Sequence, residues 1–223
     1  VSDESKAILE ESAQPPIRLV SIQSDGHEVK PGNETVMFRH EKRFFNKPGI
    51  FVRLWDDMPS EELREQAIDI ANYSVEYVGM SLAMDGIAIE ATGDGEQFSA
   101  AIKTVLDIAA IPLILIAEDP EVMAAGLDAA EEVKPLIYGA TSENWQAFAE
   151  LAKEAGAPMA VKEEYLDVLM DTTKAIKEAG VDDIVMDHGA RDWPVALAKQ
   201  TQLRRMALKK NVRGGGYPII AFP

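Results

Sequence analysis

Acidic, hydroxyl and basic side chains follow a series of short apolar stretches along the chain. They are Asp56 and Asp57, Glu90 and Thr92, Glu118 and Asp119, Thr141, Lys162–Glu164, and Asp187 with His188. Carboxylates grouped in this way could bind a divalent cation or serve as general acid and base. Helix capping competes with that interpretation, because Asp56, Asp119 and Thr141 stand just before predicted helices. We give capping the greater weight at those positions.

Asp187 and His188 form the sharpest candidate catalytic pair. A carboxylate beside an imidazole at the end of a strand could hold a proton relay. No Ser or Cys stands in a sharp strand-to-helix turn, so acyl transfer lacks a nucleophile. The structural alternative, in which Asp187 caps the next helix and His188 lines a polar loop, has the greater weight. With no cysteine and three histidines in 223 residues, we predict no metal ligands.

One segment interleaves charged and aromatic side chains, from Phe38 through Arg39, His40 and Lys42 to Phe45. Arginine and aromatic residues dominate the energetics of protein interfaces. The segment also precedes the first strand of the repeating pattern described below, which is the wrong place for a catalytic group. We therefore predict that Arg39, His40 and Lys42 belong to an interface.

A unit of apolar strand, polar turn and amphipathic helix recurs from about residue 50. We predict strands at 50–55, 87–91, 113–117, 136–139, 159–161, 184–186 and 219–222. Side-chain caps at Ser60, Asp119 and Ser142 begin helices, and Gly156 and Gly180 end them. Strands that are apolar without alternation are buried on both faces, as in a parallel sheet covered by helices. The regular succession, with no Gly-x-Gly-x-x-Gly motif, favours a (β/α)8 TIM-type barrel over a doubly wound sheet.

The same patterns divide the chain into three parts. Residues 1–16 are predicted to be a linker, and residues 17–48 a β-hairpin with a lead-in segment, in which Asp25-Gly26 forms the turn. Residues 49–223 form an incomplete barrel with about seven strands, truncated before the eighth. The alternative is closure of the barrel by a strand near 35–38.

Charge and hydropathy exclude several classes of protein. The chain has 38 acidic and 22 basic residues and a formal net charge of −16, which argues against nucleic-acid binding. No apolar run approaches the roughly 20 residues that span a bilayer. The N-terminus lacks a basic and apolar signal sequence, so we expect a cytoplasmic protein. Because residue 1 is Val rather than Met, we take the sequence as a piece of a longer chain.

Several blocks of sequence resemble one protein family. They are ETVMFRHEK at 34–42, FFNKPG at 44–49, LAMDGIAI at 82–89, PLIYGA at 135–140 with Asn144-Trp145, DIVMD at 183–187 and YPIIAFP at 217–223. In this order they resemble the large (gamma) subunit of the corrinoid iron–sulfur protein of the acetyl-CoA synthase/decarbonylase system. The resemblance runs from about residue 17 to the end of the sequence.

The resemblance implies a methyl carrier with two cofactors. In the family, a cobalt corrinoid receives a methyl group from a methyl-tetrahydropterin and passes it to acetyl-CoA synthase. The implied partners are the small corrinoid-protein subunit, in a heterodimer, a pterin methyltransferase, and acetyl-CoA synthase/CO dehydrogenase. The family's large subunit places a [4Fe-4S] cluster on a four-cysteine domain before the barrel and the corrinoid on a domain after it. This chain has no cysteine, so we assign it no cofactor ligand and expect a scaffold and interface that is not catalytic alone.

Two enzymatic alternatives stay open. A pterin-binding methyltransferase barrel would hydrogen-bond its ligand through residues such as Asp85, Glu90 and Asp187. A metal-assisted aldolase or hydrolase would use the acidic strand ends. We favour the carrier.

Overall fold

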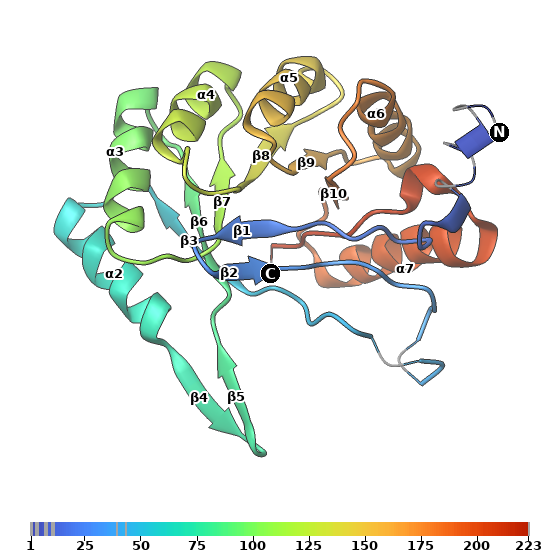
Figure 1. The fold of residues 1–223 in the computed structure, drawn as a ribbon, viewed down its shortest axis with the longest axis horizontal. Helices are drawn as coiled ribbons and strands as arrows, with labels where there is room; N and C mark the ends of the chain where they lie inside the picture. Colours follow the sequence, from blue (N-terminus) through green and yellow to red (C-terminus); the bar gives the residue numbers. More distant parts are fainter. Residues whose placement is uncertain are drawn as a thin grey trace.

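The computed structural model describes residues 2, 5, 6, 9, 12–38, 40–42 and 44–222. Its main sheet has six parallel strands: β3 (Phe51–Trp55), β6 (Gly86–Glu90), β7 (Leu113–Ile116), β8 (Leu136–Ala140), β9 (Met159–Lys162) and β10 (Ile184–Asp187). The strands lie in the sheet in their order along the chain, and the helices cover one face in an arc (Figure 1). A doubly wound sheet would reverse its strand order and carry helices on both faces. The predicted barrel-type α/β fold is therefore confirmed.

A helix follows each of the six parallel strands along the chain. The helices are α2 (Ser60–Asn72), α3 (Gly95–Leu106), α4 (Pro120–Ala129), α5 (Trp145–Ala155), α6 (Leu166–Glu178) and α7 (Trp193–Lys210), followed by the 3-10 turn η1 (Arg213–Gly215). The predicted caps at Asp119 and Gly156 are confirmed: Asp119 accepts a hydrogen bond from the Glu121 N–H, and Gly156 adopts the left-handed conformation. The predicted caps at Ser60 and Ser142 are wrong, because Pro59 and Asn144 hold the N-cap positions without a side-chain hydrogen bond.

The core has two layers, one on each face of the sheet. The outer layer packs the sheet against the helices around large buried side chains such as Phe98, Met123 and Phe148. The inner layer lies inside the curve of the sheet, where inward-facing residues of the strands meet Val20, Ile22 and Val29. The two layers together cover both faces of the strands, which explains why the strands are apolar at successive positions.

The N-terminal hairpin supplies the inner cover. Its strands β1 (Ile22–Ser24) and β2 (His27–Val29) pair antiparallel, with Ile22 opposite Val29. Gln23 also pairs with Lys134, just before β8. The hairpin thus covers the end of the sheet where the parallel strands begin, and it leaves the opposite end, where they stop, as the open mouth.

A second hairpin projects away from the body (Figure 1). It consists of β4 (Ser74–Tyr77) and β5 (Met80–Ala83), and all eight strand residues are exposed. No strand is predicted here from the sequence patterns described above. We call it the projecting ribbon.

The seventh strand is reduced to a single bridge. Ile219 pairs in parallel with Met186, and the strand predicted over 219–222 extends no further. On the other side, β3 is the edge of the sheet. Residues 35–38 form no strand, so the alternative closure near 35–38 is not observed.

Candidate functional site

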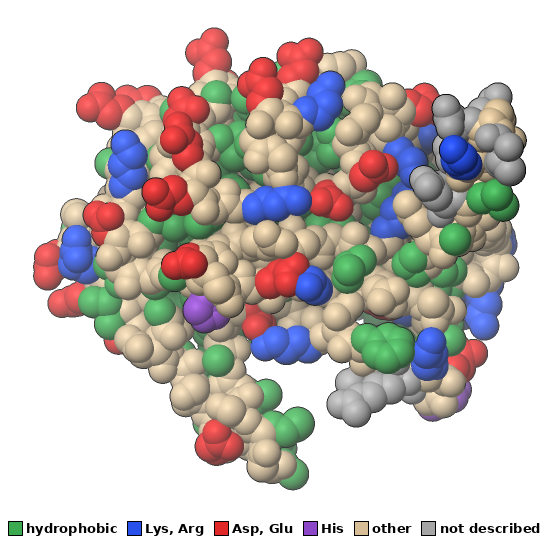
Figure 2. All heavy atoms as spheres, viewed as in Figure 1, with side chains coloured by type: hydrophobic (Ala, Val, Ile, Leu, Met, Phe, Trp, Pro, Cys, Tyr) green, Lys and Arg blue, Asp and Glu red, His purple; other side chains and the backbone are tan. Residues whose placement is uncertain are grey.

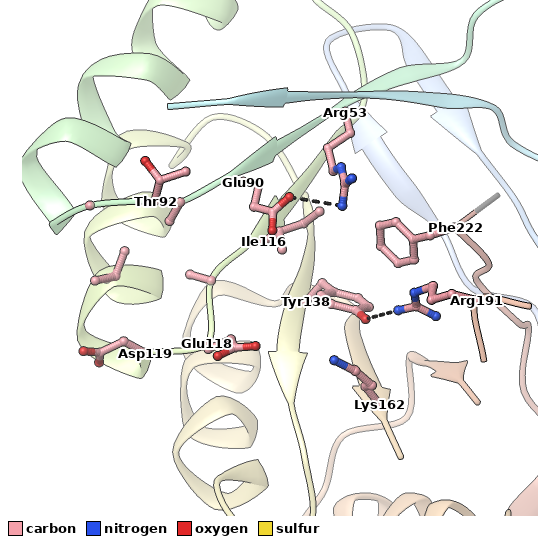
Figure 3. A pocket seen from close by; sticks show the side chains of 14 residues that line it. Arg53, Glu90, Thr92, Ile116, Glu118, Asp119, Tyr138, Lys162, Arg191 and Phe222 are labelled. Carbon is pink, nitrogen blue, oxygen red and sulfur yellow. Dashed lines mark hydrogen bonds and ion pairs between the residues drawn. The ribbon is translucent and has the colours of Figure 1, made fainter. Parts of the chain in front are cut away.

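A cavity of about 560 Å³ opens at the mouth, among the carboxyl ends of the strands (Figure 3). Glu90, Thr92, Glu118, Asp119 and Lys162, all singled out from the sequence, line it together with Arg53, Tyr138, Arg191 and Phe222. Ligand pockets of α/β barrels occupy this end because the strand-to-helix loops converge there. The mouth is therefore the candidate small-molecule site of this domain.

The buried carboxylate of Asp187 organises one wall of the cavity. It accepts hydrogen bonds from the Tyr138 hydroxyl at 2.5 Å and from the Gly189 N–H at 2.7 Å. Arg191 donates to both carboxylate oxygens, at 3.1 and 2.8 Å. Burial alone would raise the pKa of Asp187, but these hydrogen bonds outweigh it and hold the pKa below its ordinary value. Asp187 is therefore an ionised anchor for Tyr138 and Arg191.

Tyr138 and Arg191 share that anchor on the cavity side. Burial, together with the Asp187 charge, raises the pKa of the Tyr138 hydroxyl, so the hydroxyl remains a protonated donor. The ring of Phe222 meets Tyr138 edge-on, with centroids 5.3 Å apart, and lies 4.8 Å from the Arg191 guanidinium. This wall thus presents aromatic rings and the Arg191 guanidinium to the cavity, and the Asp187 carboxylate lies buried behind them.

His188 is buried beside Asp187 but faces other partners. Its Nδ1 accepts the Ala190 N–H at 3.2 Å, and its Nε2 lies 3.2 Å from the side-chain nitrogen of Gln200. Burial lowers the pKa of His188, which favours the neutral ring. No hydrogen bond joins the side chains of Asp187 and His188 among the residues that the structure describes. A catalytic role for either residue stays a prediction.

The capping alternatives at the strand ends have mixed outcomes. Asp192, not Asp187, caps α7. Asp56 does not cap α2; its buried carboxylate accepts bonds from the Thr92 N–H and hydroxyl at 2.8 and 2.7 Å and from Gln97 at 3.0 Å. Asp56 lies too far before α2 to reach the first turn of that helix. Its hydrogen bonds instead connect the end of β3 to the loop after β6.

The other charged side chains around the cavity make fewer contacts. Arg53 on β3 pairs with Glu90 at 3.2 Å. The side chains of Lys162 and Glu118 make no hydrogen bond or ion pair with any other described residue. Figure 3 shows Lys162 directed into the cavity beneath Tyr138. These two side chains are the ones free to meet a polar ligand.

Four residues of this site are not predicted from the sequence: Arg53, Tyr138, Arg191 and Phe222. Arg53 and Tyr138 lie inside apolar strands, so their inward direction depends on a sheet register that the sequence does not reveal. Arg191 precedes the cap of α7 in a polar loop, where a charged residue is unremarkable. The Arg/Tyr/Asp arrangement exists only after β8 and β10 are brought together in space.

The predicted interface lies in the segment that leads into β3. Arg39 lies outside the described residues. His40 stacks on Phe38 with ring centroids 5.5 Å apart, and Lys42 lies 5.1 Å from the ring of Phe45. Both His40 and Lys42 are exposed, so an interface role stays a prediction that their accessibility permits.

Among the described residues, no group of three or more acidic or histidine side chains is placed to hold a metal ion. None of the helices in that part of the chain has the length and apolar character needed to cross a membrane. The described residues at the mouth therefore include no such metal-binding group.

Comparison with known families gives a match over most of the chain. Residues 19–223 match the family described as CO dehydrogenase/acetyl-CoA synthase delta subunit. The chain is 37% identical over its whole length to the corrinoid/iron-sulfur protein large subunit of Moorella thermoacetica, covering 50% of that protein. It is also 37% identical to the acetyl-CoA decarbonylase/synthase complex subunit gamma of Methanosarcina acetivorans, over 97% of this chain and 47% of the relative. The chain thus spans about half the length of the curated relatives it matches.

Solved structures with a similar fold include dihydropteroate synthases. The Thermus thermophilus enzyme superposes with a TM-score of 0.56 at 15% identity, over 89% of this chain and 75% of that one. A Xanthomonas albilineans dihydropteroate synthase gives a TM-score of 0.55 at 14% identity, over 90% and 75% of the two chains. At this identity the likeness concerns the barrel fold alone.

Proposed function

The chain belongs to the CO dehydrogenase/acetyl-CoA synthase delta subunit family, and from that membership we propose that it is the barrel portion of a corrinoid methyl carrier. The carrier moves a methyl group between a methyl-tetrahydropterin, through a methyltransferase, and acetyl-CoA synthase. Identity of 37% along the whole chain to a corrinoid/iron-sulfur large subunit is the observation that carries the proposal. The barrel contributes the scaffold and the surfaces on which partners dock.

The residues of this chain agree with a supporting role. It has no cysteine, so the thiolates of an iron–sulfur cluster would come from the remaining half of the longer protein. At the mouth, Asp187 already has four donor contacts and Glu90 is paired with Arg53. The Asp187 carboxylate, with four donors around its two oxygens, holds the structure and is poorly placed to exchange protons with a substrate.

Docking of partners is assigned to the exposed lead-in segment before β3. We include His40, Lys42 and the neighbouring Arg39 in this surface. Cationic groups here contrast with a net charge of −16 for the chain, so they would select an acidic patch on a partner such as the methyltransferase or acetyl-CoA synthase.

The test is an anaerobic preparation of the full-length protein that contains this chain. We expect visible absorption bands of both a corrinoid and a [4Fe-4S] cluster. We also expect the appearance of methyl-cobalt absorbance when methyl-tetrahydropterin and the methyltransferase are added. A colourless full-length protein that accepts no methyl group would contradict the carrier proposal.

A second function, pterin binding at the mouth, has one observation in its favour. The cavity is large enough for a bicyclic ligand and contains Lys162 and Glu118 without partners. Two of the three residues expected to bind the pterin do not support this function. Asp85 lies at the start of β6, away from the mouth, and accepts the Ile50 N–H at 2.9 Å, and Asp187 is saturated as described above.

Calorimetric titration with methyltetrahydrofolate separates the two functions. Binding by the chain alone that is lost in Lys162→Ala would establish the second function. If no heat of binding is measured and the full-length protein still transfers the methyl group, pterin binding at the mouth is excluded and the carrier function stands.

A further inference from the structure

The inner face of the sheet changes from apolar to polar as the strands reach the mouth. Residues two positions apart on a strand share a face. In four of the strands an inner apolar residue is followed two positions later by a polar one: Ala88 by Glu90, Leu136 by Tyr138, Ala160 by Lys162 and Val185 by Asp187. A polar layer above an apolar one is expected where a barrel binds a ligand at its open end.

Lys162 is the uncompensated charge of that polar layer. It is half-buried at the end of β9, and Figure 3 shows its side chain directed into the cavity. In the part of the chain that the structure describes, its ammonium group makes no hydrogen bond or ion pair. Withdrawing an ammonium group from water is costly unless an opposite charge compensates it, so this position favours a bound anion.

The carboxylates around the cavity have other partners or lie in water. Asp187 is enclosed by its four hydrogen bonds. Glu90 is ion-paired with Arg53 at 3.2 Å, and Asp119 caps α4. The side chain of Glu118 is exposed. None of these groups neutralises the lysine inside the cavity.

Two arginines add hydrogen-bond donors to the same cavity. The guanidinium groups of Arg53 and Arg191 lie 5.7 and 4.8 Å from the ring centroid of Phe222, which holds both at the wall. Beyond its ion pair and these ring contacts, Arg53 makes no hydrogen bond within the described ranges, so several of its five N–H donors are available. Cations from β3, β9 and the loop after β10 therefore line one cavity.

One buried acceptor in the cavity lacks a donor. Oε2 of Glu90 lies 3.2 Å from a guanidinium nitrogen of Arg53 but accepts no hydrogen bond from any described residue. Leaving a buried oxygen unsatisfied is costly, and a hydroxyl or amino group of a ligand would satisfy it. The cavity of about 560 Å³ thus combines a place for an anionic group with a place for a donor.

The outer surface of the chain disfavours anions. Figure 2 shows acidic side chains spread over the outer helices, and the formal net charge is −16. Like charge lowers the concentration of anions near such a surface. An anion that binds this chain is therefore held by contacts at the mouth rather than by the field of the whole protein.

We propose that the mouth binds a small organic oxyanion, a carboxylate or a phosphate ester, that also carries a hydroxyl or amino group. The oxyanion lies against the Lys162 ammonium group and the free N–H groups of Arg53, and the hydroxyl or amino group donates to Glu90. This site is additional to the carrier function and needs neither the corrinoid nor the methyltransferase.

Isothermal titration of the full-length protein tests the site with succinate, L-malate and glycerol 3-phosphate at constant ionic strength. L-Malate differs from succinate by one hydroxyl group, and glycerol 3-phosphate replaces the carboxylates with a phosphate ester. We expect saturable binding of L-malate or glycerol 3-phosphate, and the tighter of the two identifies the class of oxyanion. We expect L-malate to bind roughly tenfold more tightly than succinate, because its hydroxyl group donates to Glu90.

Two substitutions that remove the same charge provide the matched comparison. Lys162→Met should weaken anion binding on the order of 30-fold, whereas Lys103→Met, on the exposed side of α3, should change it less than about twofold. Lys162→Arg should retain binding. Without an anion, Lys162→Met should unfold at no lower temperature than the parent, because it removes an uncompensated ammonium group. The bound anion should raise the unfolding temperature of the parent and not that of Lys162→Met.

Several outcomes would overturn the inference. Saturable binding of none of the three anions would do so, and Lys162-dependent binding of 6-methylpterin in their place would identify a pterin site. Equal affinity of an anion for Lys162→Met and Lys103→Met would place the anion elsewhere. Equal affinities for succinate and L-malate would refute the contact with Glu90. Methyl-cobalt formation is followed in the same preparations, so intact methyl transfer without anion binding refutes the mouth site alone, and anion binding without methyl transfer refutes the carrier alone.

Discussion

The two hairpins of this protein are the same element in opposite surroundings. Both are antiparallel ribbons with apolar residues on one face. In the N-terminal hairpin, Ile22 is 3% exposed because the inner face of the sheet covers it, whereas Leu82 of the projecting ribbon is 46% exposed. Alternation and a turn are enough to shape a ribbon, but its stability depends on what covers its apolar face.

The comparison also shows which hairpin is part of the cooperative fold. The N-terminal hairpin closes the barrel from below and shares a core with the strands, so it belongs to the cooperative unit of the fold. The projecting ribbon shares no such core, so it can open locally without unfolding the barrel. Apolar residues of the N-terminal hairpin therefore stabilise the fold, whereas those of the projecting ribbon contribute little to it.

The largest expected contrast comes from truncating one apolar residue in each hairpin. Ile22→Ala should lower the free energy of unfolding by about 2–4 kcal/mol, because it removes methyl groups from a packed core. Leu82→Ala should lower it by less than about 0.5 kcal/mol, as for an exposed site. Urea denaturation of the two variants measures both values. Equal losses would mean that the projecting ribbon is part of the cooperative core.

The turn glycines provide a matched pair of smaller effect. Gly26 and Gly79 have φ of +72° and +74°, and neither has an atom within 4 Å of the position that a Cβ would take. Each change to Ala thus imposes the same backbone strain, on the order of 1 kcal/mol. Gly26→Ala should reduce the global free energy of unfolding by that amount.

Gly79→Ala should leave the global value unchanged and instead accelerate hydrogen exchange at amides 74–83. Urea denaturation and exchange are measured on both variants. If Gly79→Ala lowered global stability as much as Gly26→Ala, the distinction between the hairpins would fail.

The sequence predicted one hairpin and not the other for a definable reason. Asp25-Gly26 is a recognised turn dipeptide, so the first hairpin was predicted. Val78-Gly79 is not, because a β-branched residue is a poor choice at positive φ. The alternation on either side of Val78 was nevertheless present and could have identified the ribbon. Turn chemistry misleads where a residue occupies a backbone conformation that its type disfavours, as Val78 does.

The candidate site shows the same division. Strand ends such as Glu90 and Lys162 were found because parallel strands send their carboxyl ends to one edge of the sheet. The partners of Asp187 were not found, because Tyr138 is separated from it by 49 positions and its hydroxyl reaches Asp187 only in the folded sheet. Element order follows from local pattern, whereas the hydrogen-bond network depends on the register between β8 and β10.

A change at the tip of the projecting ribbon should relieve its strained turn. Val78→Asn places a residue that tolerates positive φ at the strained position, so the ribbon should gain about 0.5–1 kcal/mol of local stability. Slower hydrogen exchange at amides 74–83 would show this gain, whereas global stability in urea should not change. Unchanged exchange at these amides would mean that the turn is not what limits the stability of the ribbon.

The smallest expected effect concerns how the stability that Glu28 gives to the N-terminal hairpin changes as the pH is lowered. Hydrogen bonds from Lys30, Ser21 and Gln23 lower the pKa of Glu28 on β2 from 4.5 to about 2. A carboxylate whose pKa is lower in the folded state stabilises fully above the unfolded value near 4.5, and this stabilisation is lost as pH falls toward 2. Glu28→Gln should therefore be less stable than the parent at pH 6, and the difference should shrink to zero by about pH 2.

Urea denaturation of both proteins at intervals from pH 6 to pH 2 measures this convergence. Other carboxylates with lowered pKa, such as Asp187, act equally on both proteins and cancel in the difference. A difference that stayed constant across the range would show that Glu28 contributes through neutral hydrogen bonds rather than through its charge. Because the covered hairpin unfolds with the barrel, its ionisation is visible in global stability, which is the property that the projecting ribbon is expected to lack.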